Sequence, residues 1–199
     1  MVRTAAVPDR REAILAAALH EFSERGFAGT RLDDVARRAG VAKGTIYLYF
    51  SDKEVLFQDL IRSALGPVVA MIEAADVSHL PLRAVMERLS QTLVRDVFGT
   101  SRKNVIRLVL TEGSRFPKLA EFYYREVISR IMAAMRELLK AAIARGEIDH
   151  AALVEFPQLI GAPLVLAVMW DALFSRWSPL DVEKLLRTYI DILFARSRP

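Results

Sequence analysis

The amino-acid sequence predicts an all-α protein of about nine helices. Apolar residues recur at helical spacing in almost every segment, and no stretch shows the alternation of apolar and polar residues that is typical of strands. Glycine and proline are sparse, with nine and eight residues among 199, and several stand between the apolar segments as helix breakers. Hydrophobic residues make up 53% of the chain, which excludes a disordered or fibrous protein.

The first helix is expected over residues 10 to 25, and Gly26 is expected to end it. Residues 1 to 8 lack the apolar core of a signal peptide, so we expect a short flexible arm there and a cytoplasmic protein. The apolar stripe of the first helix consists of Ile14, Leu15, Ala18, Leu19 and Phe22.

Two short helices around a tight turn are expected next. Thr30 followed by Asp33 is a capping-box pattern, which predicts a helix that begins at Arg31. Gly40 supplies the left-handed conformation that ends this helix, and KGTIYLY at residues 43 to 49 forms the second one. The pattern is a helix-turn-helix.

A fourth helix is expected after Ser51 and Asp52, either of which can cap its first turn. Phe50 is expected to fill the space between the second short helix and the first helix. Gly66 and Pro67 predict a kink or a break in the fourth helix, with a domain boundary nearby.

The second short helix carries small, aromatic and cationic groups on the side away from the expected core, and these groups suit a DNA groove. Lysine and tyrosine donate to phosphates, glycine permits close backbone approach, and threonine contacts a phosphate or a thymine methyl group. For the tyrosines, ordinary packing with an exposed hydroxyl is the alternative. The candidate DNA contacts are Thr30, Arg31, Lys43, Gly44, Thr45, Tyr47, Leu48, Tyr49 and Lys53.

The segment VARRAGVAKGTIYLYF, with Phe27 before it and DKEVL after it, resembles the N-terminal domain of the TetR/AcrR family of bacterial regulators. The likeness covers some fifty residues. Arg31, Ala42 and Tyr49 depart from it, because a small hydroxyl residue, Ser and His are common at these positions. The resemblance implies a helix-turn-helix DNA-binding domain at 9–55, a larger helical domain at 56–199 for effector binding and dimerisation, and a homodimer on a palindromic operator.

Beyond residue 66 only helices are expected, at 81–98, 102–113, 118–145, 151–175 and 179–196. The last two are apolar over more than one face, which predicts burial against a second subunit. The alternative is that both helices only close the core of one protomer. The candidate interface residues are Phe156, Ile160, Leu164, Ala167, Val168, Leu186, Tyr189, Ile190 and Leu193.

The middle helices carry flexible and aromatic side chains that suit a pocket for a small apolar effector, although residues of this kind are more often core. Arg130 is the candidate polar anchor, and a salt bridge to Glu126 or Glu137 is its alternative. The segment around residues 107 to 130 also resembles an AefR-like subgroup of the family. The candidate effector contacts are Phe98, Tyr123, Arg130, Met132, Met135 and Trp170.

The sequence contains no catalytic or metal-binding motif. His20, His79 and His150 are far apart, cysteine is absent, and the longest apolar run, at 159 to 170, is too short to span a membrane. We therefore expect no enzyme, no cofactor, no metal and no membrane contact. Residues 1 to 63 hold ten Lys and Arg against nine Asp and Glu, so charge alone does not predict DNA binding. The expected function is a ligand-responsive repressor, and a DNA-binding dimer without an effector is the alternative.

Overall fold

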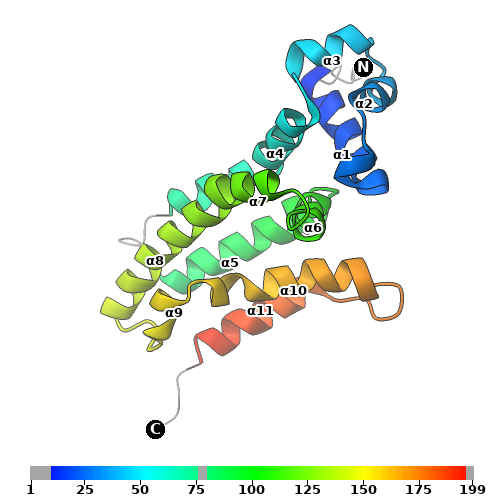
Figure 1. The fold of residues 1–199 in the computed structure, drawn as a ribbon. Coiled ribbons are helices and arrows are strands. Elements are labelled where there is room, and N and C mark those ends of the chain that lie inside the picture. The colour runs from blue at the N-terminus through cyan, green and yellow to red at the C-terminus, as the bar shows by residue number, and fades with distance from the viewer. Residues whose placement is uncertain (1–9, 76–79, 196–199) are drawn as a thin grey trace, which may run out of the picture.

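The computed structural model describes residues 10–75 and 80–195, and this part of the chain is helical with no strand (Figure 1). The predicted all-α class is therefore confirmed. The arm expected at residues 1 to 8 lies outside the described residues. The helices of the N-terminal part and the linking helix are α1 (Arg10–Gly29), α2 (Leu32–Ala39), α3 (Lys43–Tyr49) and α4 (Lys53–Glu73).

The remaining helices form the larger part of the molecule. Two of them contain short π-helical segments, labelled η1 and η2, that continue the helix before them. The elements are α5 (Leu82–Leu93), η1 (Val94–Phe98), α6 (Lys103–Glu112), α7 (Pro117–Tyr123), η2 (Tyr124–Ile128), α8 (Ser129–Ala144), α9 (Ala152–Glu155), α10 (Gln158–Phe174) and α11 (Val182–Leu193).

Helix α1 buries its apolar stripe against α2, α4 and α6. Gly26 has a φ of 67°, so the regular helix stops there and the chain turns before Phe27. The ring of Phe27 then lies 5.6 Å from that of Phe57 and 4.8 Å from that of Phe116, measured between centroids. These aromatic contacts join α1, α4 and the turn before α7 into one core.

Helix α4 runs unbroken past Gly66 and Pro67, so of the kink or break expected there the break is wrong. A proline inside a helix removes one hydrogen bond, and here the carbonyl of Ser63 lacks its usual donor. Burial of Val68, Val69 and Ile72 offsets this cost. By length and composition α4 is apolar enough to cross a membrane, but half of its apolar window is buried inside the fold.

The helix expected at 151–175 is divided into α9 and α10. Phe156 leaves the helical region with φ −117° and ψ 65°, as residues before proline tend to do, and Pro157 starts the new helix. Helix α10 tolerates Pro163 near its start.

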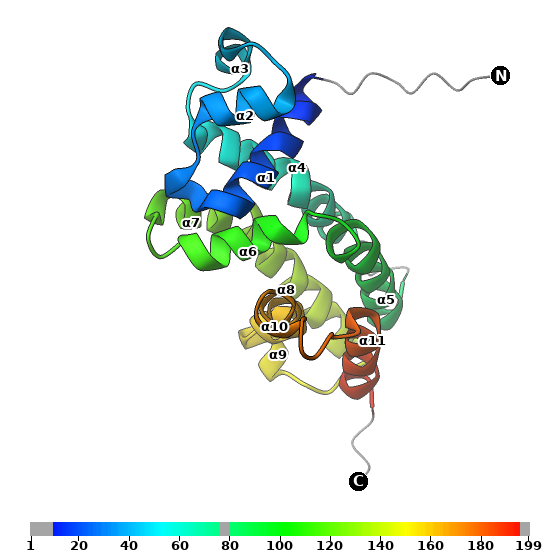
Figure 2. The same cartoon turned by 90° about the vertical axis from the view of Figure 1, so that its right-hand side faces the viewer.

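The DNA-binding candidates and the last two helices lie at opposite ends of the molecule. Figure 2 places α2 and α3 at one end and α10 and α11 at the other, with α4 leading from the first end into the larger part. In that part α8 packs against α4, and α5 contacts α4, α8 and α11. Helix α5 lies along one edge of the larger part (Figure 2) and buries Leu82, Met86 and Leu93 against it.

Candidate functional site

Helix α3 is attached to the core by one side chain and exposes most of the others. Ile46 is fully buried, and Phe50 at the C-terminal cap is 2% exposed. In contrast, Leu48 is 84% exposed, and the rings of Tyr47 and Tyr49 are 48% and 42% exposed. A seven-residue helix that presents a leucine and two tyrosines to solvent is available for recognition.

The turn between α2 and α3 is fixed by Gly40, as predicted. Its φ of 68° is left-handed, and the N–H of Val41 donates to the carbonyl of Ala36 at 3.0 Å. This closure ends α2 and sets the direction in which α3 leaves the turn. The two helices therefore form the expected helix-turn-helix.

A buried carboxylate holds α2 against α1. Glu21 is 3% exposed; the Nε of Arg38 donates to its Oε1 at 2.6 Å, and the Nε of Arg25 lies 3.3 Å from its Oε2. The hydrogen bond from Arg38 lowers the pKa of Glu21 below its ordinary value, against an opposing effect of burial. Arg25 also donates to Asp34 of α2 at 2.9 Å. These contacts set the orientation of α2, on which α3 depends.

Lys43 and Gly44 begin α3 and face solvent. The Nζ of Lys43 donates to Asp33 at 2.7 Å, and this hydrogen bond raises the pKa of the lysine. A Cβ placed on Gly44 would meet nothing within 4 Å, so the backbone there is open to an approaching partner. Arg31 is exposed, and among the described residues no hydrogen bond or ion pair engages its guanidinium. Thr45 is partly buried beside them.

Two of the candidate DNA contacts have structural roles instead. Thr30 is 1% exposed and its hydroxyl donates to the carbonyl of Gly26 at 2.8 Å, so the expected capping box is absent and α2 begins at Leu32. Lys53 donates to the carbonyls of Phe27 and Ala28 at 2.9 and 3.0 Å, and so satisfies the end of α1. Their inclusion among groove contacts is corrected, because burial and these hydrogen bonds occupy both side chains.

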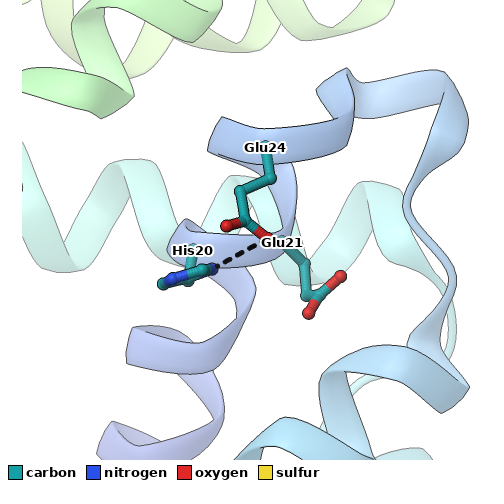
Figure 3. A group of neighbouring side chains, drawn as sticks. All are labelled: His20, Glu21 and Glu24. Atoms are coloured by element: carbon teal, nitrogen blue, oxygen red, sulfur yellow. Dashed lines mark ion pairs between the residues drawn. The ribbon is translucent and has the colours of Figure 1, made fainter.

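His20, Glu21 and Glu24 gather on α1, with one potential ligand atom from each within 4.8 Å of the others. Figure 3 shows His20 beside Glu24, joined by an ion pair at 3.3 Å, while the carboxylate of Glu21 points away. Glu21 already faces Arg25 and Arg38, so its charge is compensated. Glu24 also accepts from Arg38 at 3.4 Å, so arginines engage two of the three potential ligands, and the cluster offers a cation fewer free ligands than structural metal sites use.

An apolar hollow of about 110 Å³ lies between α4, α5, α8, α10 and α11. Met132 and Met135 line it, together with Met86 and Leu89, but Phe98, Tyr123, Arg130 and Trp170 do not. The complete lining is Val68, Ile72, Met86, Leu89, Ser90, Leu93, Ile131, Met132, Met135, Pro157, Ile160, Gly161, Leu164, Leu186, Tyr189 and Ile190.

Arg130 is wrong as a polar anchor, because it faces the outside of α8 and pairs with Glu73 of α4. Its Nε and the Oε1 of Glu73 are 2.7 Å apart, and the hydrogen bond lowers the pKa of that carboxyl group. The alternative partners, Glu126 and Glu137, are not its hydrogen-bond partners either. The true partner is 57 residues away in sequence, and only packing of α8 on α4 brings the two together.

Of the other excluded residues, Phe98 and Tyr123 pack against the surrounding core, and Trp170 lies at the turn after α10. Trp170 donates from Nε1 to the carbonyl of Ser178 at 2.7 Å and closes the turn between α10 and α11. Burial raises the pKa of Tyr123 to about 12. Phe98 ends η1 and packs on the main core. None of the three belongs to the hollow, so their assignment to it is corrected.

Helix α10 leaves six large apolar side chains exposed, and five of them lie on one face of the helix. On that face Leu166, Met169 and Leu173 follow one another at spacings of three and four residues, and the five are between 42% and 54% exposed. We name this face the α10 stripe; it consists of Leu159, Val165, Leu166, Met169 and Leu173.

Most of the predicted interface residues lie on other faces of α10 and α11. Ala167 and Val168 of α10 are buried within the protomer, and Ile160 and Leu164 are partly buried against its core. Tyr189 donates its hydroxyl to the carbonyl of Leu159 at 2.8 Å. Of the nine, only Phe156 is largely exposed, at 51%. On α11, Leu186, Ile190 and Leu193 are buried as well.

Comparison with known proteins places this geometry in a family. Residues 14–60 match the family model of bacterial regulatory proteins, tetR family, and residues 80–194 match that of the tetracyclin repressor-like C-terminal domain. The chain therefore belongs to the TetR family of bacterial regulators.

Individual relatives agree with this assignment. The chain is 33% identical over 144 residues to the HTH-type transcriptional regulator RutR of Escherichia coli (strain K12), a match that covers 71% of this chain and 60% of RutR. It thus spans less than two thirds of that relative. The HTH-type transcriptional repressor BepR of Brucella suis is 34% identical over 148 residues, covering 70% of this chain and 69% of BepR.

Among solved structures, the transcriptional regulator FadR from Bacillus subtilis, in complex with stearoyl-CoA, superposes with a TM-score of 0.72 at 20% identity. The superposition covers 94% of this chain and 99% of FadR. At this identity the likeness concerns the fold alone.

Proposed function

We propose that this chain is a repressor that binds a palindromic operator as a homodimer and is released by a small apolar effector. The observation that carries the DNA-binding part is the surface of α3. Tyr47, Leu48 and Tyr49 are exposed while Ile46 anchors the helix, and Lys43 with Gly44 stands at its N-terminus. The N-terminal residues of a recognition helix contact base edges, and cations beside it bind phosphates.

The α10 stripe supports the homodimer. Its five apolar side chains stay about half exposed in one protomer, and a second copy related by a two-fold axis would cover them. A dimer also gives two copies of α3, which reach two half-sites about 34 Å apart, one turn of B-DNA. The palindrome follows from the same two-fold symmetry.

The hollow supports an effector, because it is apolar and α4 contributes to its wall. Val68 and Ile72 of α4 line it, while Leu56 and Phe57 of the same helix are buried in the core that carries α1. A molecule that enlarges the hollow acts on α4 and so on both DNA-binding domains of the dimer. It releases DNA only to the extent that it binds the released state more tightly than the DNA-bound state.

The proposal is tested with the full chain and duplexes that cover the DNA upstream of its own coding region. Fluorescence anisotropy should detect one duplex that binds at least 1,000-fold more tightly than a scrambled duplex, which is the low end for specific regulators, about 10³. Leu48→Asp should abolish this preference, since it places a carboxylate in the groove. Equal binding of the specific and scrambled duplexes would overturn the proposal.

The volume of the hollow favours a second candidate, a DNA-binding dimer without an effector. At about 110 Å³ the hollow is well below the roughly 300 Å³ at which ligand pockets begin. Thermal unfolding against a panel of apolar compounds separates the two. A true ligand at about 100 times its dissociation constant adds about 2.7 kcal/mol to the free energy of unfolding, while a solid core gives no shift.

A further inference from the structure

Two mainly apolar hollows of the larger domain share one wall, and among the residues that the structure describes Arg88 is the one charged residue that lines the second. The first is the hollow of about 110 Å³ described above. The second, of about 270 Å³, lies between the end of α4, the start of α5 and α8. Neither volume alone reaches the usual range of ligand pockets. The side chains that line both hollows are Ile72, Met86, Leu89 and Met135.

Two of the four shared side chains can turn aside at low cost. Methionine is unbranched, has three rotatable bonds and fills irregular spaces, whereas isoleucine and leucine are branched and stiffer. Met86 and Met135 are 6% and 3% exposed, and no hydrogen bond holds either thioether. Rotating them into a hollow on either side would join the two into one elongated space.

The first hollow also meets a polar groove. Ser90 of α5 and Ile190 of α11 line both the hollow and a groove of about 450 Å³ between the two helices. Arg83, Arg95 and Arg187 lie in this groove together with Glu87, Glu183 and Asp191. By contrast, no charged side chain lines the first hollow. The two hollows and the groove therefore adjoin one another along α5, and the surroundings become charged in the groove.

We propose that the effector is an elongated amphiphile with an unbranched hydrocarbon chain. The chain passes Met86 and Met135 to fill both apolar hollows, and the polar head remains in the groove beside Ser90. The first hollow is smaller than the roughly 150 Å³ cavity that accepts benzene, so a compact ring does not fit it, whereas an unbranched chain can extend through it into the second hollow of about 270 Å³. This inference rests on the effector part of the proposed function.

The test is isothermal titration of the full chain with straight-chain alcohols of increasing length. Each added methylene should lower the dissociation constant about fourfold while it enters apolar space, until the joined hollows are full. Met135→Phe puts a rigid ring into the shared wall, so the gain should stop at a shorter chain while short alcohols bind as in the wild type. Joining the hollows by Met86→Ala with Met135→Ala should instead strengthen binding of long chains.

Leu110→Phe is the matched control, because Leu110 is exposed on α6 and lines neither hollow. It should leave the whole series unchanged. An identical series in Met135→Phe and the wild type would overturn the inference while the effector proposal stands. Tighter binding of a fused-ring alcohol with the same number of carbons would overturn it too. If no alcohol binds a wild-type protein that still recognises its operator, this inference is overturned, and the effector proposal falls with it only if the panel of apolar compounds gives no thermal shift either.

Discussion

The Nζ of Lys53, at the start of α4, lies 2.9 Å from the carbonyl oxygen of Phe27 and 4.8 Å from the centroid of the same residue's ring. The ammonium group therefore donates to backbone carbonyl groups where α1 ends. It also contacts the face of an aromatic ring of the core cluster. The contact joins two helices that are 26 residues apart in sequence. It explains why a lysine stands here in a chain whose recognition helix has its own cation, Lys43.

Lys53→Met should lower stability rather than DNA affinity. Because Lys53 is partly exposed, its hydrogen bonds and ring contact are weakened by solvent. We therefore expect the free energy of unfolding to fall by about 1 kcal/mol and the melting temperature to fall by roughly 2–4 °C. The salt dependence of DNA binding should not change. If instead the slope of log K against log salt became shallower by the amount of one phosphate contact, and the melting temperature did not change, Lys53 would bind DNA.

Lys43→Ala should have the opposite profile. Loss of one phosphate contact shallows the plot of log K against log salt by about 0.9, and melting should stay the same because the lysine is exposed. Asp33→Asn should strengthen binding to any sequence, since it releases Lys43 from its ion pair. Lys140→Ala is the control: this lysine is also exposed and paired, with Glu137 at 2.8 Å, but lies on α8.

Gly44→Ala should weaken operator binding without harming the fold. A methyl group there has open space in the free protein, and alanine favours a helix by about 1 kcal/mol over glycine. If the backbone approaches DNA closely, the added methyl should cost about tenfold in affinity, or about 1.4 kcal/mol. Gly66→Ala on α4, also in open space and outside the hollow, should leave operator affinity as it is. Undiminished affinity of Gly44→Ala would mean that α3 stays farther from the groove.

Leu166→Glu together with Met169→Glu should separate the dimer into folded monomers. Both side chains are 49% exposed in one protomer, so the carboxylates meet solvent in the monomer but would be buried and unpaired in the dimer. Sedimentation velocity measures the change, and circular dichroism checks the fold. Leu110→Glu, at an equally exposed leucine on α6, should remain dimeric. A dimeric double variant would place the interface elsewhere.

The buried Glu21 should make stability depend on acidity. Its pKa is lowered in the folded protein by the hydrogen bond from Arg38, so its contribution is present above its ordinary value of 4.5 and is lost as the pH falls through the folded value. We therefore expect the free energy of unfolding, measured with urea at several pH values, to fall less steeply at acid pH for Glu21→Gln than for the wild type. Equal slopes for Glu21→Gln and the wild type would contradict the assignment.

Local signals in the sequence predicted the parts of the fold that depend on neighbouring residues. Gly40 ends α2, Asp52 caps α4 by accepting from the N–H of Val55 at 2.8 Å, and Ile46 anchors α3. The unbroken α4 was missed, because the cost of Pro67 is offset by packing that no local pattern reveals.

The sites depend on contacts between distant segments, and there sequence reasoning was less accurate. Arg130 reaches Glu73 and Lys53 reaches Phe27 only after α8 and α1 have packed on α4. For α10 the sequence indicates a helix apolar on every side, but not which side faces the protomer. The spacing of Leu166, Met169 and Leu173 by three and four residues was a usable signal, because it places all three on one face of the helix.

The continuity of α4 links the two parts of the protein through one helix. Nineteen residue steps separate Lys53 from Ile72, or roughly 28 Å at 1.5 Å per residue, and the helix continues through Pro67. A tilt of about 5° at the hollow would displace the far end by about 2.5 Å over that length. Both arms of a two-fold dimer would move at once, so the separation of the two recognition helices would change by up to twice that amount, enough to carry them out of register with successive major grooves.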